Sequence, residues 1–185
     1  MWTKLKIIPF ILLFTIIPTL AIWFPFFFRM ETVGTIPLSL EGMATIVKNY
    51  DGPLYIVIAK TLYNLATIKE VYSFPLPVEY YAAHFPLFPA LIRLFAIPFG
   101  FPYSMLFVTV GASALALFFF HRLISKFVEK NDALWLTFIF ALFPARWLIV
   151  RSVGSPEPLF VASAIASVTF FREKKYWWAG VWGAI

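Results

Sequence analysis

Four apolar runs alternate with shorter polar segments along the chain, at residues 7–28, 103–120, 133–150 and 158–171. A helix that crosses a bilayer needs about 20 mostly apolar residues, so each run predicts a transmembrane helix. The first run is longer than the apolar part of a signal peptide and no small-residue cleavage site follows it, so we expect it to remain uncleaved. Another apolar run opens at residue 176 and soon stops, which predicts that the chain is the N-terminal part of a longer protein.

The segment between the first two runs, residues 29–101, has a broken pattern and carries most of the acidic residues. Within it, apolar positions at helical spacing predict one amphipathic helix over residues 53–68, lying in the membrane interface without crossing. Its expected apolar face comprises Leu54, Val57, Ile58, Leu62, Leu65 and Ile68, opposite Lys60, Asn64 and Thr67. Residues 84–100 are also apolar, but three prolines and Arg93 disfavour a regular span there.

Basic residues indicate which loops face the cytoplasm. Lys4 and Lys6 precede the first run, and the loops at residues 121–132 and 172–175 are rich in Lys and Arg. Because cytoplasmic loops carry an excess of these residues, we predict that the N-terminus and both loops are cytoplasmic. Both loops reach that side only if residues 84–100 lie on, or dip into, the outer face. Four polar residues then meet on the external face: Asp51, His84, Arg151 and Glu157.

Composition supports a membrane protein. The chain is 62% hydrophobic and only 13% charged, and its mean hydropathy is +0.85, which exceeds what a soluble core needs. The predicted fold is therefore an all-α, polytopic bundle in the cell membrane. It divides into an N-terminal transmembrane helix (1–28), an external loop with interfacial or re-entrant helices (29–101), and further transmembrane helices (102–185).

Charge and cysteine content narrow the partners. The net charge of +6 is expected to reflect topology and contact with lipid headgroups, since no part of the chain resembles a nucleic-acid-binding module. The absence of cysteine excludes disulfides and thiolate metal sites. We find neither a metal-ligand cluster nor a glycine-rich phosphate loop, so no cofactor is predicted and a divalent metal is not indicated.

Two carboxylates are candidates for chemistry. Asp51 precedes Gly52 and Pro53, a pattern typical of a helix start, so it is either an N-cap or a general base held at the membrane surface. Glu157 stands at the mouth of the fourth predicted span, where an acid is costly unless it is paired, solvated or used. Its simpler explanation is a favourable interaction with the helix macrodipole.

Arg146 and Arg151 are the candidate cations of the same region. Each could extend its side chain to lipid headgroups, or could bind a lipid phosphate through its planar guanidinium. His84 is the weakest candidate, because a lone histidine is more often a hydrogen-bonding group at the interface than a catalyst. A donor site without nucleotide recognition, in a membrane with its acids outside, suggests a lipid-linked donor.

Three blocks of the sequence follow the pattern of one known family. Residues 49–59 read Asn-Tyr-Asp-Gly-Pro-Leu-Tyr-Ile-Val-Ile-Ala, similar to Trp-Asp-Gly-x-x-Tyr-x-x-Ile-Ala with Tyr50 replacing the Trp. Residues 84–93 read His-Phe-Pro-Leu-Phe-Pro-Ala-Leu-Ile-Arg, similar to Phe-Phe-Pro-Leu-Tyr-Pro-x-Leu-Ile-Arg. Phe-Pro at 143–144 and Ser-Pro-Glu-Pro-Leu-Phe at 155–160 resemble Phe-Pro followed by Tyr-Thr-Glu-Ser-Leu-Phe. With these blocks in order, the chain resembles the N-terminal part of a GT-C glycosyltransferase, closest to the PIG-V-like mannosyltransferases.

The resemblance implies an inverting, multi-pass enzyme that transfers a sugar, mannose by analogy, from a polyprenyl-phosphate donor to a glycan or lipid acceptor. It implies that Asp51 is the catalytic base and that Glu157 supports it. Arg146, Arg151, His84 and Tyr55 are the expected substrate-binding residues. A chain without the family's later helices is expected to be inactive alone.

Two other functions are compatible with the sequence. A polytopic transporter or lipid flippase would have similar hydropathy, but it would show inverted repeats with broken spans in matching positions, which we do not find. A non-catalytic scaffold subunit would keep the fold and use Asp51 and Glu157 only at helix starts.

Overall fold

The computed structural model describes residues 7–73 and 77–185, and helices dominate them. The predicted all-α class is confirmed, and Lys4 and Lys6 lie outside the described residues. The elements in chain order are α2 (Ile8–Phe27), an antiparallel pair β1 (Thr32–Val33) and β2 (Ile36–Pro37), α3 (Met43–Val47), α4 (Gly52–Thr61), α5 (Leu65–Val71), the 3-10 helix η1 (Val78–Ala83), α6 (Leu87–Ile124), α7 (Lys130–Leu142), α8 (Ala145–Val150), α9 (Glu157–Arg172) and α10 (Tyr176–Gly183).

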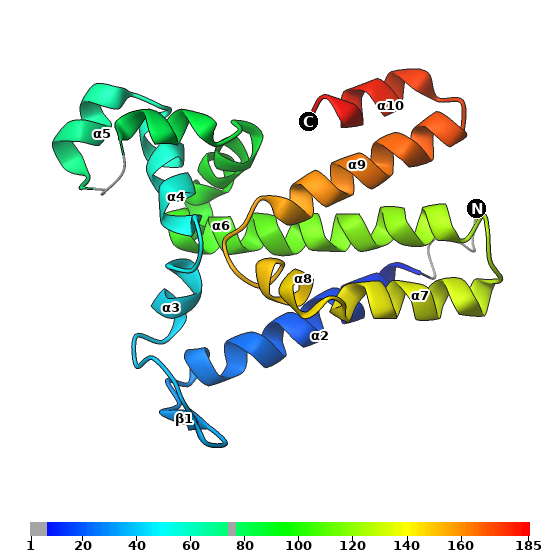
Figure 1. Cartoon of the computed structure of the whole chain (residues 1–185), viewed down its shortest axis with the longest axis horizontal. Coiled ribbons are helices and arrows are strands. Elements are labelled where there is room, and N and C mark those ends of the chain that lie inside the picture. The colour runs from blue at the N-terminus through cyan, green and yellow to red at the C-terminus, as the bar shows by residue number, and fades with distance from the viewer. Residues whose placement is uncertain (1–6, 74–76) are drawn as a thin grey trace.

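Four helices, α2, α6, α7 and α9, run along the long axis of the molecule with alternating direction (Figure 1). The central helix α6 contacts each of the other three and also α4. Ala116 of α6 and Ala162 of α9 are fully buried in one cluster with Trp147 and Val150 of α8. Small residues let helix backbones approach closely, which explains the tight α6–α9 contact.

Among the described residues, α2 and α6 are long and apolar enough to cross a membrane. In α2 most of the apolar side chains are exposed, including Ile17, Leu20 and Phe24, each more than half exposed. The run at residues 103–120 lies within α6. Helix α9 matches the run at 158–171 and has 16 residues.

The single span predicted at residues 133–150 is wrong. Helix α7 has 13 residues and ends at Leu142, and the short α8 follows after Phe143 and Pro144. Pro144 has no N–H to continue the α7 ladder, and it disfavours helical geometry in the residue before it. Phe143 is accordingly extended, with φ −124° and ψ 144°.

The single amphipathic helix predicted at residues 53–68 is also wrong. Helix α4 ends where Leu62 and Tyr63 adopt positive φ values of 49° and 62°. Asn64 then caps α5, because its side-chain oxygen accepts a hydrogen bond from the Thr67 N–H at 3.0 Å. The break moves Leu62 and Leu65 of the expected apolar face out to exposed positions.

Residues 87–99 form the first part of α6, and Gly100 interrupts the helix with φ 71° and ψ 160°. A positive φ of this kind is open to glycine and strained for other residues. Phe88 and Ile92 of this part pack against Tyr55 and Ala59 of α4. The segment is therefore joined to α4 at one end of the molecule, and its depth in a membrane stays a prediction.

The two basic loops lie together at the other end. Glu173, after α9, forms ion pairs with Arg122 and Lys126 at the end of α6 and with Lys175. The two loops therefore lie at the same end of the bundle, as expected, and they contact each other directly. The side of the membrane that they face stays a prediction.

Candidate functional site

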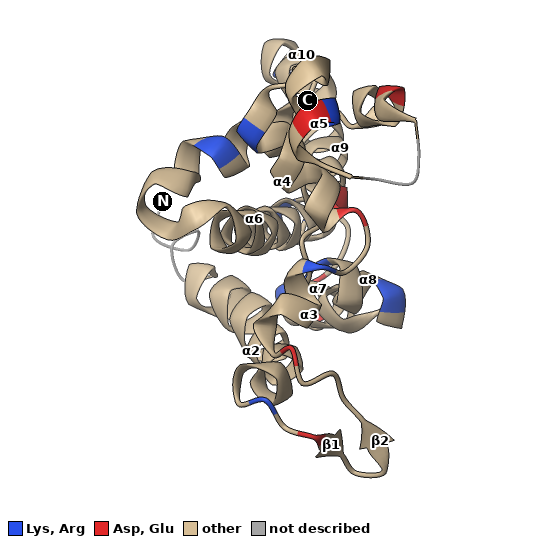
Figure 2. Ribbon diagram, turned by 90° about the vertical axis from the view of Figure 1, so that its left-hand side faces the viewer, with Lys and Arg blue, Asp and Glu red and all other residues tan. Residues whose placement is uncertain are grey.

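The candidate site forms where the start of α4 meets the loop that precedes α9. A Cβ added at Gly52 would lie 2.7 Å from the Val47 carbonyl oxygen and 3.3 Å from that of Gly154. A Cβ at Gly154 would lie 2.1 Å from the Met105 methyl carbon. The two glycines therefore let α4, the loop and α6 approach closely, and both Asp51 and Glu157 lie near enough to Tyr55 to act on its hydroxyl electrostatically. Figure 2 shows acidic segments of the ribbon, drawn in red, beside α4 and α5.

Asp51 does not cap α4 with its side chain. Its φ of −85° and ψ of 8° differ from the extended geometry usual for a capping residue. Its backbone carbonyl accepts from the N–H groups of Leu54 and Tyr55, at 3.0 and 3.2 Å. The carboxylate is exposed and takes no hydrogen bond from the described residues, so it is available to a ligand.

Glu157 is the first residue of α9 and accepts a short hydrogen bond from the Ser155 hydroxyl. Ser155 is fixed in turn by Thr109 of α6, whose hydroxyl lies 3.2 Å from the Ser155 nitrogen and 3.1 Å from its carbonyl oxygen. The preceding loop therefore orients the Glu157 carboxylate, although Glu157 itself is exposed. Ser155 was not predicted as a site residue. Its position two residues before Glu157 was the only local indication of this role.

The Tyr55 hydroxyl interacts electrostatically with both carboxylates. Burial raises the pKa of its hydroxyl, and the negative charges of Glu157 and Asp51 raise it further. The hydroxyl therefore stays protonated at neutral pH and is a hydrogen-bond donor. Tyr55 also lines a cavity of about 210 Å³ together with Phe85, Leu87, Phe88, Pro156, Glu157, Leu159, Phe160 and Ile185.

His84 holds Tyr55 in place. The two rings meet edge to face with centroids 4.8 Å apart, and Tyr80 packs on His84 at 5.3 Å. His84 is 5% exposed, and its Nδ1 lies 3.1 Å from the Tyr80 carbonyl oxygen. Because a carbonyl can only accept, Nδ1 is the donor of this hydrogen bond.

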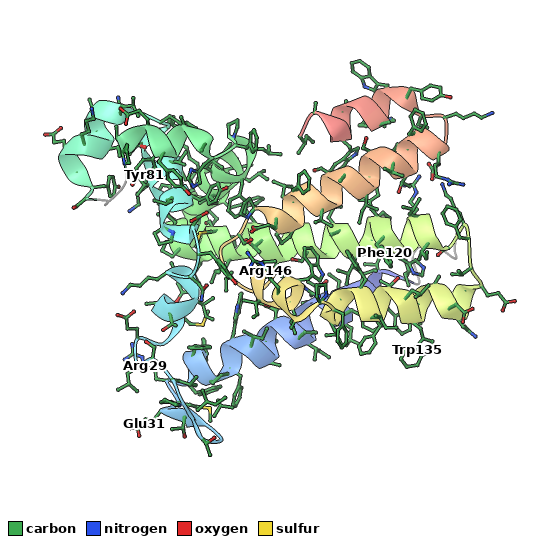
Figure 3. All side chains as sticks on the ribbon, viewed as in Figure 1. Arg29, Glu31, Tyr81, Phe120, Trp135 and Arg146 are labelled. Carbon is green, nitrogen blue, oxygen red and sulfur yellow. The ribbon has the colours of Figure 1, made fainter. Side chains whose placement is uncertain are left out.

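Arg146 reaches the same region from α8. Its guanidinium carbon lies 5.9 Å from the ring centroid of Tyr50, the neighbour of Asp51 (Figure 3). The side chain is exposed, and Tyr50 has a positive φ of 48°. An accessible cation therefore lies beside Tyr50, the residue that precedes Asp51, and this contact was not predicted from the sequence.

Arg151 does not lie on the external face as expected. It is fully buried, and its Nη2 donates to the carbonyl oxygens of Phe14 and Thr15 at 3.1 and 3.0 Å. Its Nη1 makes a short hydrogen bond to the carbonyl of Ala141, near the end of α7. The carbonyls at a helix end lack partners within the helix, and Arg151 supplies one there while joining α7 to α2.

The structure thus brings together Asp51, Tyr55, His84, Arg146 and Glu157, and separates Arg151 from them. Within residues 7–73 and 77–185, no group of three or more His, Cys, Asp or Glu side chains gathers to hold a metal ion. Searches against family models, curated proteins and solved structures give no match.

Proposed function

We propose that this chain belongs to a multi-pass membrane glycosyltransferase of the GT-C type. In this proposal it transfers a sugar, mannose by resemblance, from a polyprenyl-phosphate donor to a glycan or lipid acceptor outside the cell. The observation that carries the proposal is the Asp51 carboxylate: it is exposed, it does not cap α4, and it lies with Tyr55 and Glu157 at the end opposite the basic loops.

The membrane setting is supported by α2 and α6, which have the length and hydropathy of spanning helices. Helix α2 exposes large apolar side chains along its length, as a lipid-facing helix does. The alternating direction of α2, α6, α7 and α9 is compatible with repeated crossing (Figure 1).

The proposed chemistry is inverting transfer. The acceptor hydroxyl oxygen attacks the anomeric carbon while the bond from that carbon to the lipid phosphate oxygen breaks. Asp51 takes the hydroxyl proton as general base, a role that needs an unpaired carboxylate within reach of the acceptor. The lipid phosphate leaves as an anion, and Arg146 is the cation placed to stabilise it.

The other residues act through position in this proposal. Tyr55 donates a hydrogen bond from its protonated hydroxyl to a sugar or phosphate oxygen. Glu157, oriented by Ser155, accepts hydrogen bonds from sugar hydroxyls. His84 is a positioning residue, because its ring packs on Tyr55.

A donor comparison tests the proposal. The complete gene product in liposomes is supplied with mannosyl polyprenyl phosphate or with a nucleotide sugar, and the product is analysed by NMR. We expect transfer from the lipid-linked donor with inversion at the anomeric carbon. Use of the nucleotide sugar alone, or retention of configuration, would overturn the proposed donor or mechanism. Transport of the intact lipid without transfer would favour the flippase.

A further inference from the structure

The basic end of the bundle contains a second cavity, unrelated to the residues of the candidate site. Its volume is about 330 Å³, and it is lined by Ile7, Phe118, His121, Arg122, Ser125, Lys126, Lys130 and Glu173. The lining comes from the start of α2, the end of α6, the start of α7 and the turn after α9. Four separate segments therefore line one pocket, which has both charged and apolar parts.

Positive charge exceeds negative charge at this pocket. Lys126 and Lys175 lie 2.9 and 3.1 Å from the carboxylate of Glu173, which Arg122 also contacts with two nitrogens. Lys130 lines the same pocket and forms no ion pair within the described part of the chain. Of the residues that line the cavity, three cations (Arg122, Lys126 and Lys130) against the Glu173 carboxylate leave a net charge of +2.

Arg122, Lys126 and Lys175 are held in place by contacts within the protein. The Arg122 guanidinium carbon lies 5.0 Å from the ring centroid of Phe170, and Lys175 lies 5.8 Å from the same ring. Arg122 and Glu173 are the less exposed members of the ion-pair cluster, with side chains 24% and 17% exposed. A preorganised cluster of this kind loses little entropy when it binds an anion.

The apolar part of the lining indicates the other end of the ligand. Ile7 immediately precedes α2 and Phe118 lies in α6, and these two helices are long and apolar enough to cross a membrane. A ligand in the pocket therefore meets both cations and apolar side chains. An anionic phospholipid has this arrangement of a phosphate and acyl chains.

We propose that this pocket binds the phosphate of an anionic phospholipid. Lys126 and Lys130 contact the phosphate, Arg122 supports them, and Glu173 competes with the ligand for the same cations. The site shares the membrane setting of the proposed function but does not depend on glycosyl transfer.

Lipid binding to the full chain in detergent, measured by native mass spectrometry, tests this proposal. Phosphatidylglycerol should bind more tightly than phosphatidylcholine. A charge near a membrane surface contributes about fivefold per lysine, so the double variant Lys126→Gln with Lys130→Gln should weaken phosphatidylglycerol binding on the order of twentyfold. Glu173→Gln removes the competing carboxylate and should strengthen it.

The matched control is Lys48→Gln with Lys69→Gln, which removes two exposed lysines at the opposite end of the molecule. It changes net charge equally and should leave phosphatidylglycerol binding within about twofold of the parent. Equal weakening in both double variants, or weaker binding in Glu173→Gln, would overturn the site. Displacement of the lipid by millimolar glycerol phosphate, with no preference between the two lipids, would overturn the lipid assignment and assign the site to a soluble phosphate ester.

Discussion

The two ends of this bundle use carboxylates in opposite ways. At the basic end, Glu173 is contacted by three cations. Burial raises the pKa of Glu173, but the hydrogen bonds from Arg122, Lys126 and Lys175 outweigh this and lower it to about 2. At the other end, Asp51 takes no hydrogen bond from the described residues, and Glu157 takes one from Ser155. A carboxylate that is paired with several cations holds neighbouring loops together. A carboxylate without a cationic partner can accept a proton.

The two arginines near the acidic end differ in the same sense. Arg151 uses its guanidinium on three backbone carbonyls inside the bundle. Arg146 is exposed beside Tyr50, and its donors form no hydrogen bond with the residues that the structure describes. Residue type alone therefore does not separate a structural group from a functional one; the number of internal partners does.

The placement of the two ends on opposite sides of the membrane is the first prediction. Single cysteines replace Ser39, before α3, and Ser125, after α6, both of which are exposed. An impermeant thiol reagent added to intact cells should label the cysteine at 39 and not the one at 125. Labelling at 125 from outside would reverse the orientation and place the candidate site in the cytoplasm.

The second prediction concerns Arg151. Replacing it with Gln removes the guanidinium and leaves the buried carbonyl oxygens of Phe14, Thr15 and Ala141 without the hydrogen bonds that it donates. This loss should lower the free energy of unfolding by about 3–5 kcal/mol. Arg146→Gln is the matched control and should change stability by no more than about 0.5 kcal/mol, as exposed substitutions usually do. Denaturation of both variants in detergent makes the measurement. Equal stability of the two would contradict the assigned roles.

The third prediction concerns donor binding by Arg146. In the full-length protein, Arg146→Gln should weaken binding of a polyprenyl-phosphate sugar by about 1.5–3 kcal/mol, the contribution of a hydrogen bond to a charged group. Lys48→Gln, which removes another exposed cation at this end, should have little effect. Equilibrium binding of the lipid-linked sugar decides, and an unchanged affinity in Arg146→Gln would limit that residue to headgroup contact.

The fourth prediction is the pH dependence carried by Glu173. A carboxyl with a lowered folded-state pKa stabilises the protein above its unfolded pKa of about 4.5 and loses this effect as the pH falls toward about 2. Each partly exposed ion pair contributes about 0.2–1 kcal/mol, so the loss should be small. Unfolding measured from pH 6 to pH 2 should show the loss in the parent and not in Glu173→Gln. Parallel curves would contradict the account.

Local sequence signals predicted α2, the part of α6 at residues 103–120 and α9, but they merged α4 with α5 and α7 with α8. The convergence of Asp51, His84 and Glu157 followed from topology, because basic loops constrain which segments share a side. The break after Leu142 was visible as Pro144, but the apolar residues around it suggested a continuous span. The position of Arg151 could not be predicted, since the carbonyls that it contacts belong to residues far away in the sequence.

The break between α4 and α5 teaches a related point. Asn64 was assigned to the polar face of a continuous helix, although asparagine is also a strong N-cap. The helical spacing of the apolar residues on both sides obscured this second possibility. In the structure α4 instead packs against α5 and η1, where Leu54, Val57 and Ile58 are buried in one cluster with Ile68 and Tyr81, and Leu62 is left exposed.

The central claim is that Asp51, whose carboxylate takes no hydrogen bond from the described residues, is the base for glycosyl transfer. The transfer rate of the Asp51→Asn enzyme tests this claim most directly. The complete gene product is assayed with a mannosyl polyprenyl phosphate donor, beside Glu70→Gln, which removes an exposed acid from α5 at the same end. Asp51→Asn should lower the transfer rate by about 10²–10⁴-fold, the usual effect of losing a general base. Stability should change by at most about 1 kcal/mol in both variants, and Glu70→Gln should keep its transfer rate. A folded Asp51→Asn enzyme that transfers sugar as fast as the Glu70→Gln control would contradict the account.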